Sequence, residues 1–381
     1  MSERLRVLLV EDSEDDALLL VRVLRQAGYD TFFRRVQSEP EMVAALDAQG
    51  WDIVLSDHNM PGFSSQRALE LVRSRGLDTP FIIVSGMIGE AAAVEAMRAG
   101  AQDYIMKGQF ARLAPAIERE LRDAQARRER VLAEKALLAQ TEELRIARDI
   151  QEDLSPSEMP LIEGYDIAGL SRQAEATGGD YFDFIPLRDE SLALVVGDVT
   201  GHGIGPALLM SDVRACLRAL AQTCKGIGEI IAHANRLLEA DLGEDRFITL
   251  IVASLNARGH RLEYLNVGHP AAYVLGADGV VKAHLTSEIP AIGLNREGVF
   301  PAVGVAQLAP GEIVLFLTDG VLESSSPAGE DFGVERVLQV VRDHAAESAT
   351  QIVGAVTNAV RQFAAPAAQQ DDITVVVMKV L

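Results

Sequence analysis

The sequence predicts a multidomain fold: an α/β doubly wound domain, a helical coiled-coil linker, and an α+β layered β-sandwich. Three observations predict it. Short apolar runs alternate with amphipathic segments over the first third of the chain. Residues 116–152 then contain neither Gly nor Pro and are rich in Ala, Leu, Glu, Arg and Gln. After residue 160 apolar strand-like runs dominate, interleaved with pairs of helical patterns.

Length and charge restrict the functional classes. The 381 residues suggest two or three domains at roughly 150 residues each. With 35 Lys and Arg against 56 Asp and Glu, the formal net charge is −21, which argues against binding nucleic acid or anionic membranes. The two cysteines, Cys216 and Cys224, lie in one helical stretch and favour neither disulfides nor zinc. No apolar run reaches the ~18–20 residues of a membrane span, and the apolar start is too short for a signal peptide, so we expect a cytoplasmic protein.

The first domain reads as alternating strands and helices. We expect strands at Arg6–Asp12, around Phe32, and at Asp52–His58, Phe81–Gly86 and Asp103–Lys107. We expect helices at Asp15–Gln26, Pro40–Ala48, Ser64–Arg75 and Glu90–Ala99. Strand runs that are apolar without alternation suit strands buried on both faces. The order therefore predicts a parallel sheet with right-handed crossovers.

A long charged helix follows, from about Pro115 to Glu152, and SPSEMP (Ser155–Pro160) ends it. One possible coiled-coil seam contains Ile117, Leu121, Ala124, Val131 and Leu138. A second seam in a shifted register contains Leu137, Leu144, Ala147 and Leu154. Such a helix is typical of a dimerising connector. The Arg and Gln cluster at Arg127–Arg130 is interpreted as a solvated face of the coiled coil. The alternative is one solvated helix lying on a neighbouring domain.

The remainder is rich in β-structure. We expect strands at Tyr181–Leu187, Leu192–Val199, Phe247–Asn256, Arg261–His269, Ala271–Gly276, Ile313–Gly320 and Asp372–Val380. Helical patterns lie at Ile204–Gln222, Ile227–Ala240, Val334–His344 and Ala349–Phe363. Strand runs interleaved with helix pairs predict the layered sandwich.

Polar residues follow the predicted strands of the first domain: Glu11 and Asp12, Asp57, Ser85, and Lys107. In an open parallel sheet the ends of such strands form one ligand-binding crevice. The three carboxylates can hold a hard cation such as Mg²⁺, which lets a carboxylate act as the nucleophile toward phosphate. Lys107 can pair with one phosphoryl oxygen and the Ser85 hydroxyl can donate to another.

The motifs VED, LSDHNMPG, IVSG and DYIMK resemble the response-regulator receiver domain, a flavodoxin-like fold, over residues 4–120. We assign residues 1–122 to it. The resemblance implies Mg²⁺ bound by Glu11, Asp12 and Asp57, phosphorylation of Asp57 by a histidine kinase or a small phosphodonor, and a switch pair of Ser85 and Tyr104. One departure is Gly108, which follows Lys107 where proline is usual and removes the rigidity of that loop.

Four aspartate motifs adjoin strands in the second half: GGDYFDF, GDVTGHG, LTDG and QQDDITVVVM. An unpaired buried charge is costly, and few Lys or Arg lie nearby, so the pattern favours cations as partners. Ligation by oxygen alone points to Mg²⁺ or Mn²⁺ rather than zinc. Two such ions ~3.5–4 Å apart can activate a water for in-line attack on phosphorus.

These motifs, with ALLMS, LNVGHP and the preceding ELRIARDIQEDLSP, resemble PPM-type metal-dependent protein phosphatases of the stage II sporulation protein E branch, over residues 144–381. We place the linker at 123–158 and this domain at 159–381. The resemblance implies that Asp198 bridges two Mn²⁺ or Mg²⁺ ions, that the Val199 carbonyl ligates one, and that further carboxylates complete the site. Those carboxylates are Asp180, Asp319 and Asp371.

Three neighbouring residues are left with alternatives. Asp372 is an alternative ligand to Asp371, and either Asp183 or Asp372 can bind an additional ion or support the ligands. His202 is either a general acid or a residue that shapes its loop. His269 is expected to support structure.

The combined resemblance implies a two-component response regulator whose output is hydrolysis of phosphoserine or phosphothreonine on a protein, gated by Asp57. The implied partners are a histidine kinase, a phosphorylated anti-sigma-factor antagonist of the STAS type, and a second copy of the chain through the linker. The competing hypothesis is a non-enzymatic adaptor that uses the phosphatase-like domain as a docking scaffold. The sequence does not give the sign of regulation.

Overall fold

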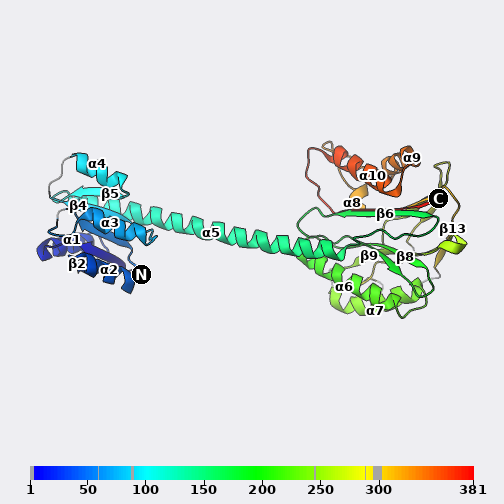
Figure 1. The fold of residues 1–381 in the computed structure, drawn as a ribbon, viewed down its shortest axis with the longest axis horizontal. Coiled ribbons are helices and arrows are strands. Elements are labelled where there is room, and N and C mark those ends of the chain that lie inside the picture. The colour runs from blue at the N-terminus through cyan, green and yellow to red at the C-terminus, as the bar shows by residue number, and fades with distance from the viewer. Residues whose placement is uncertain (1–3, 59, 87–89, 244–245, 288, 295–302) are drawn as a thin grey trace. The chain divides into compact units, whose positions relative to one another are not determined.

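The computed structural model describes residues 4–58, 60–86, 90–243, 246–287, 289–294 and 303–381. Asn59, which belongs to the LSDHNMPG motif, lies outside them. The chain divides into two compact units, Met1–Ala139 and Gln140–Leu381, which are described separately (Figure 1). None of the helices in the described part of the chain has the length and apolar character of a membrane span.

The first unit is a five-stranded parallel sheet in the order β2-β1-β3-β4-β5. Its strands are β1 (Leu5–Val10), β2 (Thr31–Val36), β3 (Ile53–Asp57), β4 (Phe81–Ser85) and β5 (Asp103–Met106). Its helices are α1 (Glu14–Gln26), α2 (Glu39–Ala48), α3 (Ser65–Ser74), α4 (Glu90–Arg98), the 3₁₀ turn η1 (Phe110–Arg112) and the first part of α5 (Leu113–Leu154). The doubly wound α/β prediction is confirmed.

Two apolar layers hold this unit together, one on each face of the sheet. Leu8, Val54 and Ile83 pack toward α2 and α3, whereas Leu9 and Ile82 pack toward α1 and α5. Alternate residues of one strand therefore enter different cores, which is why the strands are apolar without a polar face.

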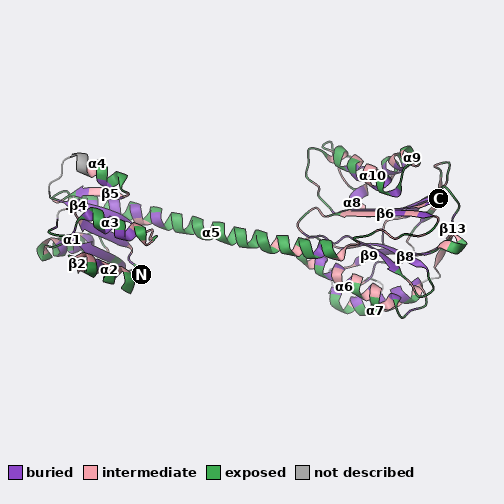
Figure 2. Cartoon of the chain, in the orientation of Figure 1, coloured by how far each residue is buried: buried purple, intermediate pink, exposed green. Residues whose placement is uncertain are grey.

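Helix α5 contributes to both units, and its first turns depart from the predicted seam. Ile117 and Ala124 are buried in the core of the first unit. Arg127 makes an ion pair with Asp78, and Arg128 donates to the carbonyl of Asp78, while both arginines remain exposed to solvent. The first turns of α5 therefore form the last helix of the α/β domain, because their apolar residues are spaced to pack into the core of the first unit. The following stretch of α5 is exposed along its length (Figure 2).

The second unit contains two antiparallel sheets, each of five described strands, in the orders β13-β10-β9-β8-β7 and β12-β11-β14-β15-β6. The first sheet comprises β7 (Tyr181–Pro186), β8 (Leu192–Val199), β9 (Ile248–Asn256), β10 (Arg261–Val267) and β13 (Gly304–Gln307). The second comprises β6 (Tyr165–Arg172), β11 (Ala272–Leu275), β12 (Val281–Leu285), β14 (Ile313–Leu317) and β15 (Ile373–Val380). The strands β6, β12 and β13 were not among those expected from sequence.

Helices cover the outer face of each sheet (Figure 1). They are α6 (Ile204–Ala221) and α7 (Ile227–Leu242) on the first sheet, and α8 (Asp319–Leu322), α9 (Gly333–Asp343) and α10 (Ala349–Ala364) on the second; η2 (Ala257–Gly259) is a 3₁₀ turn after β9. A separate core between the sheets includes Leu194, Ile251, Phe316 and Val376. This is the predicted layered sandwich.

Candidate functional site

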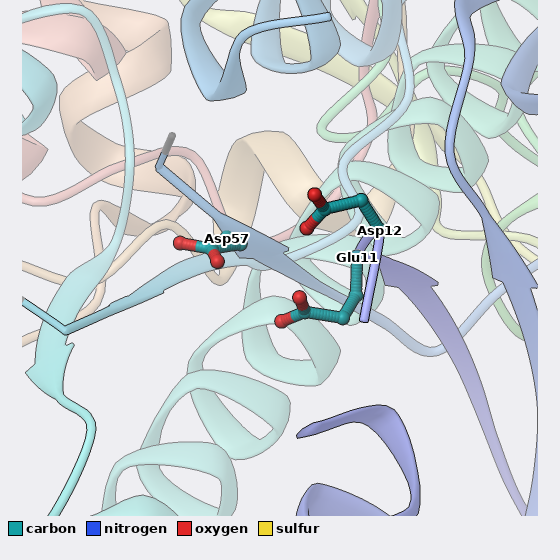
Figure 3. Close-up of side chains that lie close together, drawn as sticks. All are labelled: Glu11, Asp12 and Asp57. Atoms are coloured by element: carbon teal, nitrogen blue, oxygen red, sulfur yellow. The ribbon is translucent and has the colours of Figure 1, made fainter. Parts of the chain in front are cut away.

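The first unit brings three carboxylates together beside the ends of β1 and β3. One oxygen of each of Glu11, Asp12 and Asp57 lies within 4.8 Å of the others (Figure 3). Because β1 and β3 are adjacent and parallel, the residues that follow them meet at one edge. Oxygen ligands from three carboxylates suit a hard divalent cation.

Lys107 lies among the same carboxylates. Its Nζ is 3.0 Å from Glu11 Oε2, 2.8 Å from Asp57 Oδ2 and 2.5 Å from Asp16 Oδ2. Its backbone N–H donates to the carbonyl of Ser85 at 2.7 Å, which continues the β4–β5 pairing. Burial acts to lower the pKa of Lys107, but hydrogen bonds to these carboxylates outweigh it and raise the pKa above its ordinary value. Lys107 is therefore a fixed cation in this site.

Hydrogen bonds also fix the backbone at Glu11 and Asp12. Glu11 is almost completely buried, and burial raises the pKa of its carboxyl group, with Lys107 acting in the opposite direction. Arg35, from β2, donates through Nη1 to the carbonyls of both Glu11 and Asp12 at 3.1 Å. These contacts fix the peptide between the two acids, and sequence inspection did not single out Arg35.

The two residues expected to form a switch pair lie on neighbouring strands. Ser85 ends β4 and is buried, and Tyr104 lies on β5, paired in register with Ile83. Within the described residues, the hydroxyl of Tyr104 is buried without a hydrogen-bond partner. An unpaired buried hydroxyl is unfavourable, so an alternative rotamer that reaches a partner would relieve it.

In the second unit three predicted carboxylates line one open groove. Asp198 at the end of β8, Asp319 at the start of α8 and Asp371 before β15 border a cavity of about 490 Å³. Further groove residues are Thr200, Gly201, His202, Gly320, Glu323, Ser324, Ser325, Ala364, Ala367, Ala368, Gln369 and Gln370. Among the residues that the structure describes, no Lys or Arg lines this groove.

Asp180 lies beside this groove in the interior and is only 3% exposed. Its Oδ2 accepts a hydrogen bond from the hydroxyl of Thr318 at 2.8 Å. Burial and then repulsion from Asp198 raise the pKa of Asp180 well above its ordinary value. Thr318, the residue before Asp319, thus orients a second predicted ligand, a role that the LTDG motif alone did not reveal.

The remaining carboxylates repel one another. Burial, followed by repulsion from Asp319 and Asp371, raises the pKa of Asp198 to about 7. Burial and repulsion from Asp371 raise the pKa of Asp319 in the same direction. Such a set suits divalent cations, which would replace mutual repulsion by attraction. No three of these side chains have ligand atoms mutually within 4.8 Å, unlike Glu11, Asp12 and Asp57.

Glycines make this close approach possible. A Cβ on Gly178 would lie 1.8 Å from Asp372 Oδ2, and one on Gly179 would lie 2.3 Å from the carbonyl oxygen of Val199. A Cβ on Gly320 would lie 1.9 Å from the carbonyl oxygen of Asp372. Any side chain there would displace the backbone on which the carboxylates are mounted. The GGD and DG motifs are thus packing requirements of the site.

The end of α5 holds the loop that carries Asp180. The side-chain amide of Gln151 donates to the carbonyl of Gly178 at 2.7 Å and accepts from its N–H at 3.1 Å, and Gln151 is buried. Arg148 donates to the carbonyls of Ala176 and Glu175 at 3.0 and 2.8 Å. Sequence inspection noted this helix end as a connector but assigned no role to either residue.

Asp183 lies elsewhere in the unit. Its oxygens are 2.7 and 2.6 Å from Arg218 Nε and Nη2, and it also accepts from the hydroxyl of Tyr181 and the N–H of Phe184. This carboxylate, which was considered as an additional metal ligand, has its acceptor sites occupied by a buried ion pair between β7 and α6.

Asp372 and His202 differ in how they lie relative to the groove. Asp372 accepts from the N–H groups of Ala174 and Asp180 at 2.8 and 3.4 Å, so it braces the loop rather than facing the groove. His202 lines the groove, is strongly exposed, and its Nδ1 lies 3.1 Å from Glu175.

His269 joins the two sheets behind the site. Its Nδ1 bonds the hydroxyl of Thr249 on β9 at 2.9 Å, and its Nε2 bonds the carbonyl of Leu317 on β14 at 3.1 Å. Because a carbonyl only accepts, Nε2 carries the proton. His269 therefore supports the strand end that positions Thr318 and Asp319.

Comparison with known families decides the assignment. A model described as stage II sporulation protein E (SpoIIE) matches residues 188–381, and one described as response regulator receiver domain matches residues 7–118. The chain belongs to the stage II sporulation protein E family. Its first unit carries a receiver domain, in agreement with the strand-end residues described above.

Curated relatives match part of this chain. Protein IcfG from Synechocystis sp. (strain PCC 6803) is 27% identical over 61% of this chain and 41% of its own length. Phosphoserine phosphatase RsbU from Bacillus subtilis is 26% identical over 55% of this chain and 62% of its own length. The match thus spans about half of these relatives.

Solved structures share the fold of part of this chain. The SiaA PP2C domain of Pseudomonas aeruginosa covers 64% of this chain and 98% of its own, with a TM-score of 0.56 and 23% identity. The structure of the RsbU and RsbW domains of Rv1364c from Mycobacterium tuberculosis covers 59% of this chain and 62% of its own, with a TM-score of 0.51 and 25% identity. These likenesses support the layered sandwich.

Proposed function

We propose that this chain is a response regulator whose output is metal-dependent hydrolysis of phosphoserine or phosphothreonine on a partner protein. The observation that carries the proposal is the groove shared by Asp198, Asp319 and Asp371, with Asp180 buried beside it. Its carboxylates come from separate strand ends and repel one another, an arrangement that favours bound cations. The name of the relative RsbU, phosphoserine phosphatase, supports the same class of reaction.

Different residues of the groove have different proposed roles in hydrolysis. We assign two Mn²⁺ or Mg²⁺ ions to Asp180, Asp198, Asp319, Asp371 and the carbonyl of Val199; these would supply Lewis acidity and lower the pKa of a water. The water oxygen forms a bond to phosphorus, the bond from phosphorus to the serine oxygen breaks, and a proton given up by the water ends on the serine oxygen. Thr318 and Gly179 hold the ligands in place. The open groove admits a phosphorylated side chain on a protein loop.

The receiver supplies the regulatory input. Mg²⁺ bound by Glu11, Asp12 and Asp57 would neutralise an incoming phosphoryl group. An oxygen of Asp57 then attacks phosphorus while the bond to the donor's leaving group breaks, and Lys107 pairs with a phosphoryl oxygen. A histidine kinase is the proposed donor. Ser85 and Tyr104 are the proposed switch pair, and the hydroxyl of Tyr104, which has no hydrogen-bond partner among the described residues, supports a rearrangement.

Helix α5 is the proposed route of control and the proposed dimer contact. Val131, Leu137 and Leu138 are exposed along its middle, which suits pairing with a second copy of the chain. At its end, Gln151 holds the peptide of Gly178, two residues before Asp180. A change in the helix would therefore alter the position of a metal ligand. The proposed substrate is a phosphorylated STAS-type anti-sigma-factor antagonist.

The test is Mn²⁺-dependent hydrolysis of an aryl phosphate by the full chain, with and without beryllofluoride. Asp57→Ala serves as the receiver control and Asp198→Asn as the phosphatase control. We expect turnover that needs Mn²⁺ and Asp198, and that changes with beryllofluoride only when Asp57 is present. Turnover insensitive to beryllofluoride would reject the gating.

The substrate is tested separately with a serine-phosphorylated STAS-domain protein and with an unrelated phosphoserine peptide. Selective dephosphorylation of the STAS protein supports the partner assignment, and equal rates reject it. If neither is hydrolysed in Mn²⁺ or Mg²⁺ and Asp198→Asn preserves the cellular output, the adaptor hypothesis replaces the enzyme.

A further inference from the structure

The ammonium group of Lys107 has three N–H donors, and three carboxylates surround it. Glu11 and Asp57 belong to the trio that suits a cation. Asp16 does not belong to that trio. It lies in the first turn of α1, and its Oδ2 is 2.5 Å from Nζ, the shortest of the three separations.

The three contacts change differently when a phosphoryl group is transferred. The new bond joins an oxygen of Asp57 to phosphorus, the donor's bond to phosphorus breaks, and the leaving group keeps the electron pair. The carboxylate of Asp57 that held Lys107 is thereby converted to an acyl phosphate and loses its negative charge. Glu11 is shared with the cation. Asp16 is the partner of Lys107 that neither process takes away.

We propose that Asp16 is a positioning residue that holds the Lys107 ammonium beside Asp57 while the cation and the phosphoryl group engage the other carboxylates. The inference rests on the proposed phosphorylation of Asp57. It adds a residue from α1, outside the strand-end motifs, to the residues that prepare the receiver for phosphoryl transfer.

The local structure supports this role. The backbone N–H of Asp16 donates to Ser13 Oγ at 3.2 Å, and the N–H of Ser13 donates to Glu11 Oε1 at 3.2 Å. Asp16 is thus fixed relative to the acidic pair through the cap of α1. The chain after Lys107 gives less support, because Gly108 has a φ of +109° and no neighbouring atom within 4 Å of a Cβ position. A side-chain anchor compensates for this backbone freedom.

Asp15 provides a matched control for charge. It lies in the same first turn of α1, is exposed, and is not among the three carboxylates around Lys107. Replacing either aspartate by asparagine removes one negative charge from the same helix end. Only the change at Asp16 removes a hydrogen bond to Lys107.

The experiment measures the rate at which acetyl phosphate phosphorylates the full chain, over a range of Mg²⁺ concentrations, by intact-protein mass spectrometry. The variants are Asp16→Asn, Asp16→Glu and Asp15→Asn. We expect Asp16→Asn to lower the maximal rate at saturating Mg²⁺ about 10-fold, as loss of a charge-assisted hydrogen bond implies. Asp16→Glu restores most of the rate, and Asp15→Asn stays within about twofold of the parent chain. Fluorescence of the single tryptophan, Trp51, confirms that the receiver is folded in each variant.

The outcomes separate the two ideas. If Asp16→Asn and Asp15→Asn behave alike, or if Asp16→Asn changes only the Mg²⁺ concentration for half-maximal rate, Asp16 contributes charge alone and the inference is rejected. A faster rate in Asp16→Asn rejects it as well. If the parent chain is neither phosphorylated nor responsive to beryllofluoride, the phosphoacceptor role of Asp57 fails, and the inference fails with it.

Discussion

The amide of Gln151 and the peptide of Gly178 form a closed pair of hydrogen bonds, one in each direction. Both groups are buried, so water does not replace a lost partner. Gly178 also packs against Asp372 and precedes Gly179 and Asp180. A contact of α5 is therefore two peptide bonds from a proposed metal ligand.

Gln151→Ala should lower metal-dependent turnover about 10-fold, because each lost hydrogen bond contributes about 1 kcal/mol to the order of the loop. Gln151→Glu should do no better, since a carboxylate cannot donate to the carbonyl of Gly178. Gln140→Ala, an exposed glutamine of the same helix, is the control and should leave turnover unchanged. Turnover of aryl phosphate at several Mn²⁺ concentrations is the measurement. Equal rates in all three variants would show that this contact does not order the site.

Asp198 and Asp183 should respond oppositely to the same substitution. Asp198→Asn removes a groove carboxylate whose neighbours repel it, so turnover should fall more than about 100-fold while unfolding without metal is unchanged or shifted to higher temperature. Mn²⁺ binding by titration calorimetry and unfolding by scanning calorimetry would measure both effects. Strong destabilisation would contradict the repulsion inferred for this cluster.

Asp183→Asn should destabilise the second unit and leave the metal ligands in place. The change breaks a buried ion pair and a hydrogen bond from Tyr181. The cost should be roughly 2 kcal/mol, below the usual range for buried pairs because Arg218 is 40% exposed. Scanning calorimetry measures it, and the Mn²⁺ dissociation constant should change less than about threefold. Loss of Mn²⁺ binding from a folded variant would assign Asp183 to the metal site after all.

Much of the receiver site followed from the strand-end rule. Glu11 and Lys107 are 96 residues apart in sequence, yet their side chains are 3.0 Å apart because the strands before them belong to one parallel sheet. An apolar run of four residues marked β1 and one of three residues marked β5. The rule does not extend to Asp16 or Arg35, whose contacts depend on how α1 and β2 pack beside the strand ends.

In the second unit the sequence predicted the sheets better than their edges. The edge strands β12 and β13 are short and half exposed, with alternating burial, and therefore lack a strong apolar pattern. The contact of Gln151 with Gly178 joins a helix to a loop with no shared periodicity. Asp183, one of two candidates for an additional ion or a supporting role, shares its motif with Asp180, but its carboxylate contacts Arg218 on α6, a contact that the motif does not reveal.

Two glycine substitutions should have opposite effects. Gly178→Ala would place a Cβ 1.8 Å from Asp372 Oδ2 and should abolish turnover through displacement of the loop. Gly354→Ala, inside α10 with no atom within 4 Å of the Cβ position, should stabilise the second unit by about 0.5–1 kcal/mol. Turnover and calorimetric unfolding of both variants provide the measurement. An active Gly178→Ala variant would show that this loop has room to move.

His269 should make the second unit sensitive to acid. Burial lowers the pKa of His269 from its ordinary 6.5 to about 3, although its bond to the Leu317 carbonyl acts in the opposite direction. Between these values the unfolded chain binds one more proton than the folded chain, so stability falls as pH falls, by about 1.4 kcal/mol per pH unit from this residue. Above the unfolded pKa this contribution to stability is fully present.

Carboxyl groups whose pKa is raised in the folded chain have the opposite effect, because they increase stability as pH falls. Comparing the parent chain with His269→Gln cancels their effect and leaves the contribution of His269. Glutamine retains a donor for the Leu317 carbonyl but does not titrate. Trp51, the single tryptophan, lies in the first unit, so its fluorescence reports the unfolding of that unit. A calorimetric transition without a matching change in fluorescence is therefore assigned to the second unit. The stability difference between the parent chain and the variant should shrink as pH falls from about 6.5 toward 4. A difference independent of pH would mean that His269 has the same pKa in the folded and the unfolded chain.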